Sequence, residues 1–192
     1  MFAIAITLLV LDIKVPRDLP EETSLLTALL KQWPIYLAFL TSFATIGIMW
    51  LNHHRMFKYI KRIDHWFLVL NGLLLLGITF VPFPTSLVAE YIQRADRTVA
   101  VLVYTGTFTL IAVVFNVMWW YAAHDYRLLD EKVAPHWING ITHQYRFGPP
   151  LYLLTFVLAF VNVWLSLAVN AALTLFFLLP QAAPPDSAAG QS

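Results

Sequence analysis

Four residues near the start of the chain have the types and spacing to line a path for ions. They lie at i, i+3, i+4 and i+7 of a helix and so share one face: Ile4, Thr7, Leu8 and Leu11. If several copies of this face met around an axis, they would form a narrow apolar tube containing one layer of hydroxyl groups. Apolar rings gate pores by dewetting, and oxygen atoms can replace part of a cation's hydration shell. The same pattern is also typical of an ordinary lipid-facing or buried helix, so these residues alone leave both interpretations open.

A second polar group, Asn52-His53-His54, follows Trp50 at the end of an apolar window. The two adjacent imidazoles point about 100° apart on a helix, so they cannot both bind one metal ion without further ligands. One interpretation is that these residues simply lie at the membrane interface. We favour a structural lock, because Trp50 and His54 lie at i, i+4 and could hold a neighbouring helix by hydrogen bonds. The sequence therefore predicts neither a metal site nor a cofactor.

The composition is that of an integral membrane protein. Of 192 residues, 59% are hydrophobic and only 12% are charged, whereas soluble domains contain about 25% charged residues. The mean hydropathy is +0.68. The net charge of +1 gives no field that would attract nucleic acid. The apolar windows contain no deeply placed ionisable group, which argues against an ion-coupled transporter, and the absence of a nucleophile–base pair or phosphate-binding loop argues against an enzyme.

Charge-free windows predict the membrane-spanning helices, since a span needs about 20 apolar residues. Four such windows cover residues 33–54, 66–89, 98–123 and 147–185. The last is too long for one crossing, and Asn162 favours a tight hairpin near residues 161–163 that divides it into two. Pro82 and Pro84 mark a kink or an end of the second window.

The first apolar stretch, Met1–Leu11, is long enough for only about half a bilayer. Asp12 and Lys14 end it, and Pro16 prevents its continuation. With this truncated first helix, the sequence predicts an all-α, polytopic membrane protein of six transmembrane helices. Residues 19–30 are expected to form a short amphipathic helix between the first two spans. Residues 1–180 would form the membrane domain, and the Ala- and Pro-rich tail, residues 181–192, is expected to be disordered.

Loop charges predict the orientation. The loop after the second span carries four basic residues against the single acid Asp64, namely Arg55, Lys58, Lys61 and Arg62. The preceding loop, residues 12–31, carries three basic residues against four acidic ones. The positive-inside rule places the basic loop in the cytoplasm. Alternation then places both termini in the cytoplasm, in a multi-pass protein of the cell membrane.

The segment Phe2-Ala-Ile-Ala-Ile-Thr-Leu-Leu-Val-Leu-Asp-Ile-Lys-Val-Pro16 and the block Trp50-Leu-Asn-His-His54 resemble the transmembrane protein 175 family of endosomal and lysosomal potassium channels, in its short prokaryotic form. The resemblance covers the whole six-helix layout and implies a homotetramer whose pore is lined by the first helix. It implies hydrophobic pore layers at Ile4 and Leu11 with Leu8 beside them, and a contribution of Thr7 to cation selectivity. It also implies that Trp50 and His54, next to Asn52, bond to a signature motif in the first helix.

That signature, Arg-x-x-x-Phe-Ser-Asp, directly precedes the Phe-Ala-Ile-Ala-Ile stretch in the family, whereas this sequence begins at Met1. We expect that the sequence starts at an internal codon and that a further N-terminal segment belongs to the natural protein. The predicted function is a potassium-permeable cation channel that conducts passively, with potassium ions, the lipid bilayer and further copies of the chain as its partners. The alternative is a non-conducting membrane scaffold or helper subunit, and an enzyme using His53 and His54 with a metal is the least favoured.

Overall fold

The computed structural model describes residues 1–17, 24–130 and 135–178, and every regular element in those ranges is helical. The α-helices are α1 (Phe2–Leu9), α2 (Leu25–Lys31), α3 (Trp33–Tyr59), α4 (His65–Phe80), α5 (Pro82–Tyr91), α6 (Arg97–Ala123), α7 (Pro135–Val161) and α8 (Val163–Leu178). Short 3₁₀ turns, η1 (Val10–Asp12) and η2 (His124–Tyr126), follow α1 and α6. The all-α fold class is thus confirmed.

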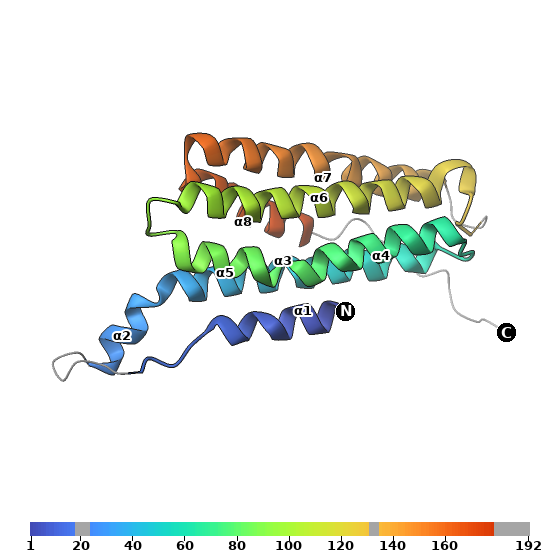
Figure 1. The fold of residues 1–192 in the computed structure, drawn as a ribbon. Helices are drawn as coiled ribbons and strands as arrows, with labels where there is room; N and C mark the ends of the chain where they lie inside the picture. The colour runs from blue at the N-terminus through green and yellow to red at the C-terminus, as the bar shows by residue number, and fades with distance from the viewer. Residues whose placement is uncertain (18–23, 131–134, 179–192) are drawn as a thin grey trace.

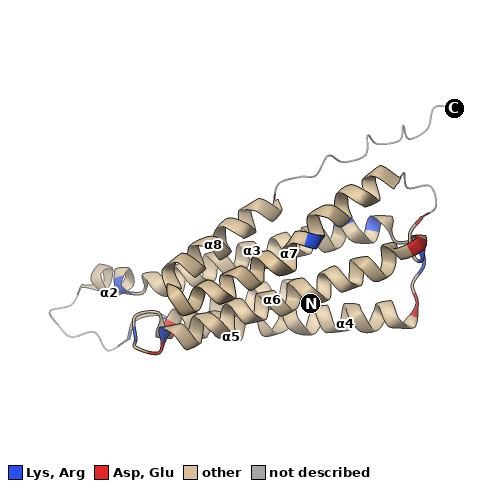
Figure 2. Ribbon diagram, turned by 90° about the horizontal axis from the view of Figure 1, so that it is seen from above, with Lys and Arg blue, Asp and Glu red and all other residues tan. Residues whose placement is uncertain are grey.

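The long helices form an elongated bundle (Figure 1). Helices α6 and α7 lie side by side on one side of it, and α3 packs on α5. Helix α1 lies on the outside of this arrangement, against α3, α4 and α5, and extends along only the half of the bundle nearest α2. Figure 2 shows that charged residues gather mainly at the two ends of the bundle, as expected for helices that lie in lipid.

Three helical segments are long and apolar enough to cross a membrane: Trp33–Tyr59, His65–Tyr91 and Arg97–Tyr126. They coincide with three of the predicted windows. The second segment comprises α4 and α5, which are interrupted at Val81, just before Pro82. Pro82 lacks the N–H that a continuous helix would need at this point, so the predicted break lies between two helices of one segment. Phe2–Asp12 and Val163–Leu178 are shorter apolar helices.

The last apolar window folds as a helical hairpin with Asn162 at its turn. Helix α7 ends at Val161 and α8 begins at Val163, which confirms the predicted position. The side-chain oxygen of Asn162 accepts hydrogen bonds from the backbone N–H groups of Trp164, at 2.9 Å, and Leu165, at 3.1 Å. An amide oxygen in this position caps a helix N-terminus, which explains why the turn occurs at this polar residue. Helix α7 begins at Pro135, well before the predicted window.

The helix expected between the first two spans begins at Leu25, with Ser24 as its N-cap: the Ser24 hydroxyl accepts a hydrogen bond from the N–H of Thr27 at 3.2 Å. The first part of the predicted helix, up to residue 23, lies outside the described residues. The tail for which we predict disorder, residues 181–192, also lies outside them.

Helices α4 and α6 approach closely at Gly77. A Cβ atom placed on Gly77 would lie 2.8 Å from Cγ1 of Ile111, whereas one on Gly72 of the same helix would meet nothing within 4 Å. We expect Gly77→Ala to lower the free energy of unfolding by about 1–3 kcal/mol, because the crowded Ile111 must move. Gly72→Ala should be neutral or slightly stabilising, because alanine favours helix. Thermal unfolding in detergent compares the two, and equal effects would contradict the close approach.

The loops at the end of the bundle opposite α2 are tied together around Asp64. The Asp64 carboxylate accepts hydrogen bonds from the Tyr121 hydroxyl at 2.7 Å and from the N–H of Phe67 at 2.9 Å, and Arg127 lies 3.4 Å from it. Backbone hydrogen bonds from Lys61 to Leu128, and from Asp130 to Tyr59, join the same loops. The two loops that follow α3 and α6 therefore act as one unit.

These contacts make stability depend on pH. The Tyr121 hydrogen bond, followed by that of Phe67, holds the pKa of Asp64 below its usual value. The resulting stabilisation is fully present above about pH 4, the unfolded pKa, and is lost as the pH falls through the lower folded value. Asp64→Asn should therefore lower the Tm at pH 7. Between pH 4 and pH 2, the Tm of this variant should decrease less than the Tm of the unchanged protein. Asp96→Asn is the matched control, because Asp96 precedes α6 without a capping hydrogen bond from its side chain; the same response from it would contradict the assignment.

Candidate functional site

Helix α1 has two faces with different surroundings. Phe2, Ala5 and Leu9 are buried, at 8%, 0% and 1% exposed, where α1 packs on α3, α4 and α5. The face predicted to line a pore is exposed: Ile4 is 54% exposed, Leu8 41% and Leu11 68%, and Thr7 is exposed as well. The described part of the chain thus leaves this apolar stripe uncovered, while the opposite stripe attaches α1 to the subunit.

Thr7 provides the polar element of this stripe. Its hydroxyl donates a hydrogen bond to the backbone carbonyl of Ile4 at 2.9 Å. Because the proton is used within the helix, the oxygen lone pairs remain free to face outward as acceptors. The exposed face therefore presents an oxygen atom between the apolar side chains of Ile4 and Leu8, and that atom can only attract a cation or accept a hydrogen bond.

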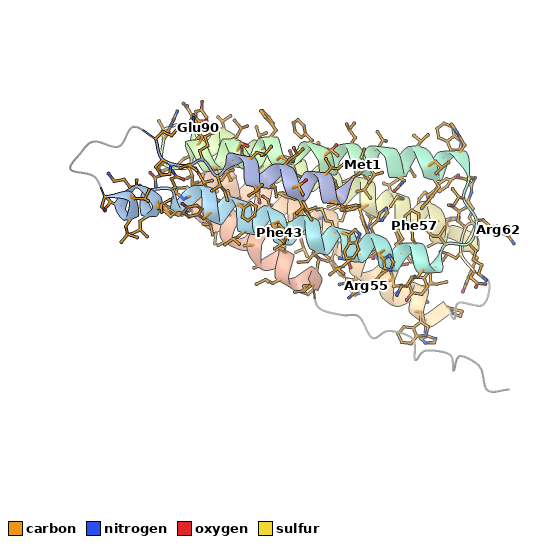
Figure 3. The ribbon with its side chains drawn as sticks, turned by 90° about the horizontal axis from the view of Figure 1, so that it is seen from below. Met1, Phe43, Arg55, Phe57, Arg62 and Glu90 are labelled. Atoms are coloured by element: carbon orange, nitrogen blue, oxygen red, sulfur yellow. The ribbon has the colours of Figure 1, made fainter. Side chains whose placement is uncertain are left out.

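The start of α1 is held by His53. The Phe2 ring lies 5.2 Å from the imidazole of His53, measured between centroids, and the same imidazole lies 4.4 Å from the ring of Phe57. Nε2 of His53 is 2.9 Å from Oδ1 of Asn71 on α4. Figure 3 shows α1, which starts at Met1, lying between α3 and the α4–α5 segment. His53 therefore connects α1, α3 and α4, a role that the sequence did not reveal, although the aromatic spacing of His53 and Phe57 at i, i+4 was visible.

The other end of α1 is held by a carboxylate. The Ser86 hydroxyl on α5 lies 2.5 Å from Oδ2 of Asp12, the last residue of η1. A carboxylate at the C-terminal end of a helix is electrostatically unfavourable, so the hydrogen bond from Ser86 offsets part of that cost. Helix α1 is thus fixed to α3 near its start and to α5 near its end.

The residues predicted to form a lock are divided between two surroundings. Trp50 and His54 are exposed, and their rings stack on each other with centroids 6.0 Å apart. Asn52 is half-buried, and its amide donates to the backbone carbonyl of Phe177 on α8 at 3.3 Å. The carbonyl of Asn52 lies 3.4 Å from the Tyr145 hydroxyl on α7. Asn52 therefore fixes α3 against α7 and α8, whereas Trp50 and His54 form an aromatic pair on the subunit surface.

The two adjacent histidines do not converge. His53 faces α1 and α4, and His54 stacks on Trp50. Among residues 1–17, 24–130 and 135–178, no group of three or more His, Cys, Asp or Glu side chains lies close enough to hold a metal ion.

Comparison with known proteins identifies the family. Residues 1–82 match the family described as "Endosomal/lysosomal potassium channel TMEM175". A potassium channel of Chamaesiphon minutus is 54% identical over 180 residues, which cover 93% of this chain and 89% of the relative. The chain belongs to the TMEM175 family. A second relative, a potassium channel of Streptomyces collinus, is 42% identical over 188 residues, which cover 96% of this chain and 90% of the relative.

The fold agrees with a solved TMEM175 structure. The crystal structure described as that of a lysosomal potassium-selective channel TMEM175 homolog from Chamaesiphon minutus superposes with a TM-score of 0.83 at 53% identity. The superposition covers 92% of this chain and 89% of the other. The helices described above are thus arranged as in a TMEM175 channel, and the chain is a channel protein rather than an enzyme.

Proposed function

We propose that the protein is a potassium-permeable cation channel that conducts passively through a pore lined by α1 of four identical subunits. The observation that carries this proposal is the uncovered stripe of Ile4, Thr7, Leu8 and Leu11, which lies opposite the buried attachment face of the same helix. An apolar stripe that contains one hydroxyl residue, on a membrane helix, can pack against the same stripe of other subunits around a common axis. Relatives named as potassium channels support the choice of ion.

In the proposed tetramer, each apolar residue of the stripe contributes to a ring. Rings of Ile4, Leu8 and Leu11 would form the narrow layers, which conduct only when they are wetted. The ring of Thr7 lies between the first two, and its oxygen atoms would replace part of the hydration shell of a passing cation. Selectivity would then depend on the constriction and on Thr7.

We place each subunit in the cell membrane with six transmembrane helices, of which the first, α1 with η1, is truncated. The others are α3, the α4–α5 segment, α6, α7 and α8. Helix α7 has 27 residues, which gives about 40 Å of helix and exceeds the thickness of the hydrocarbon core. Residues 1–180 would form this channel domain. The basic end, which carries Arg55 and Arg62 in Figure 3 at the opposite end from Glu90, would face the cytoplasm. Helix α1 begins part-way along the bundle with its start directed toward that end, and we place both termini on the cytoplasmic side.

We further propose that Trp50 and His54 form the lock near the pore helix. Their stacked rings are exposed on α3 and can therefore contact residues that α3 does not meet within the subunit. Asn52, which binds α7 and α8, would keep this part of α3 in place while the pair makes its contact.

Potassium flux into liposomes reconstituted with the protein tests the function. Purified protein should run as a tetramer in mild detergent and should carry potassium down its gradient without a second coupled ion. A strictly monomeric protein would overturn the proposed pore, because one α1 cannot enclose a path. A stable tetramer without flux would instead favour the non-conducting scaffold.

A further inference from the structure

A groove lies between four helices at the end of the bundle nearest α2. Its volume is about 230 Å³, and the described residues that line it come from α3, α6, α8 and the last part of α5 with the residue that follows it. Figure 1 shows that α3, α6 and α8 begin at this end and that α5 ends there. None of these lining residues belongs to α1, so the groove is separate from the stripe that we propose as the pore lining.

The groove extends along the helices from the end of the bundle toward its middle. On α3 the lining begins at Trp33 and reaches Thr41, and on α8 it begins at Trp164 and reaches Ala171. Such a stretch of helix is about 10–12 Å long at about 1.5 Å per residue. Because these helices cross the bilayer, the groove is roughly parallel to the lipid chains around them.

The interior of the groove is apolar. Both hydroxyl groups among its described lining residues have partners: Thr41 donates to the carbonyl of Leu37 at 2.8 Å, and the Tyr104 hydroxyl lies 3.2 Å from Oγ of Ser42. None of these lining residues is charged. An apolar cavity of about 150 Å³ in another protein stays dry and accepts benzene. A hydrocarbon occupant therefore suits the groove better than water.

The mouth of the groove has the residue types of a membrane interface. Trp33 and Trp164 are 41% and 44% exposed, and their rings stack with centroids 6.1 Å apart. Tryptophan is enriched where lipid head groups meet the hydrocarbon. Lys31, which is exposed, and Gln32 directly precede Trp33 in the chain. A cationic, polar segment next to the mouth suits the phosphate of a lipid head group.

We infer that this groove binds one acyl chain of a membrane phospholipid in each subunit, with the head group beside the two tryptophans. The occupant is an acyl chain because the groove is apolar inside, lies parallel to the bilayer chains and has an interfacial mouth. An empty groove would also lose the dispersion contacts that a chain makes with its walls. In the orientation proposed above, the lipid belongs to the outer leaflet.

A photoreactive lipid tests the inference on the unchanged protein. The probe is a phosphatidylcholine with a diazirine midway along one acyl chain, used as a minor component of dioleoylphosphatidylcholine vesicles that contain the protein. On illumination the diazirine loses N₂, the resulting carbene inserts into a neighbouring bond, and mass spectrometry locates the adducts. A chain in the groove should label Val88 and Ile92, which line it and are only 6% and 3% exposed. Adducts confined to outward-facing residues such as Leu175, which is 64% exposed, would overturn the inference and favour a second copy of the chain as the occupant.

Two adjacent alanines on α8 provide a variant and its matched control. Ala171 lines the groove, whereas Ala172 is exposed and does not line it. Ala171→Phe places a ring in the groove and should lower the labelling of Val88 and Ile92 about tenfold, which corresponds to about 1.4 kcal/mol of binding free energy. Ala172→Phe should leave the labelling unchanged, and equal labelling in the two variants would overturn the inference.

The labelling of the unchanged protein decides the matter by itself if Ala171→Phe does not assemble. Neither measurement depends on potassium flux, so the inference stands or falls independently of the proposed function.

Discussion

Ile4→Ala and Leu11→Ala should each raise the potassium flux of reconstituted protein. Both side chains are exposed on the uncovered stripe of α1, and in the proposed tetramer they form the apolar rings that an ion must pass. Truncating them widens the ring, so a passing ion keeps more of its hydration shell and the dewetting barrier falls. A reduction of about 1.4 kcal/mol in this barrier corresponds to about a tenfold increase in flux. The discrimination between potassium and sodium should fall in the same variants.

Leu110→Ala is the control for these two variants. Leu110 on α6 is 68% exposed, as is Leu11, but it lies on a helix that contributes nothing to the proposed pore. Its truncation should leave flux and ion preference unchanged. If Ile4→Ala and Leu11→Ala behave like Leu110→Ala, α1 does not line the conduction path.

The adjacent residues Leu8 and Leu9 provide the sharpest test of the two faces of α1. Leu9 is 1% exposed and attaches α1 to the bundle, whereas Leu8 is 41% exposed on the stripe. Leu9→Ala should lower the free energy of unfolding by about 2 kcal/mol, at the low end of the usual range, because in lipid the loss is one of packing more than of transfer from water. Leu8→Ala should leave stability nearly unchanged and alter potassium flux.

Thermal unfolding and liposome flux, measured on both variants, separate these effects. The substitution is chemically the same in both cases, so only the direction of the side chain differs. The opposite outcome, with Leu8→Ala destabilising and Leu9→Ala altering flux in a fully stable protein, would mean that the two faces of α1 have been exchanged. We expect Leu9→Ala also to reduce flux, because an eight-residue helix is not stable by itself.

The sequence was most informative where a local pattern decides the structure. The position of the hairpin was predicted from Asn162, a polar residue within an apolar window. An amide in lipid needs hydrogen-bond partners, and Asn162 finds them by capping the N-terminus of α8. The helical repeat of about 3.6 residues correctly placed four residues on one face: Ile4, Thr7, Leu8 and Leu11. The start of α7 at Pro135 was not predicted, because the absence of charge marks the part of a helix in lipid and not the turns that extend beyond it.

Contacts between distant residues could not be predicted in the same way. The hydrogen bond between Tyr121 and Asp64, and that between Ser86 and Asp12, depend on how helices assemble, which no local spacing encodes. The packing of the individual histidines was also beyond the sequence: the ring of His53 lies against Phe2, whereas the ring of His54 stacks on Trp50. Periodicity shows which residues share a face, but the identity of the helix that meets that face depends on the whole bundle.

The two attachments of α1 have a mechanical consequence. Phe2 packs against His53 on α3, and Asp12 accepts a hydrogen bond from Ser86 on α5. The two ends of α1 are therefore attached to two different helices, which act as its supports. The second support is weakened at one point, since Pro82 at the start of α5 has no N–H to donate back to α4. A bend of α5 at this point would move the Asp12 end of α1 more than the Phe2 end. In the proposed tetramer, such a movement would change the width of the pore at Leu11 more than at Ile4.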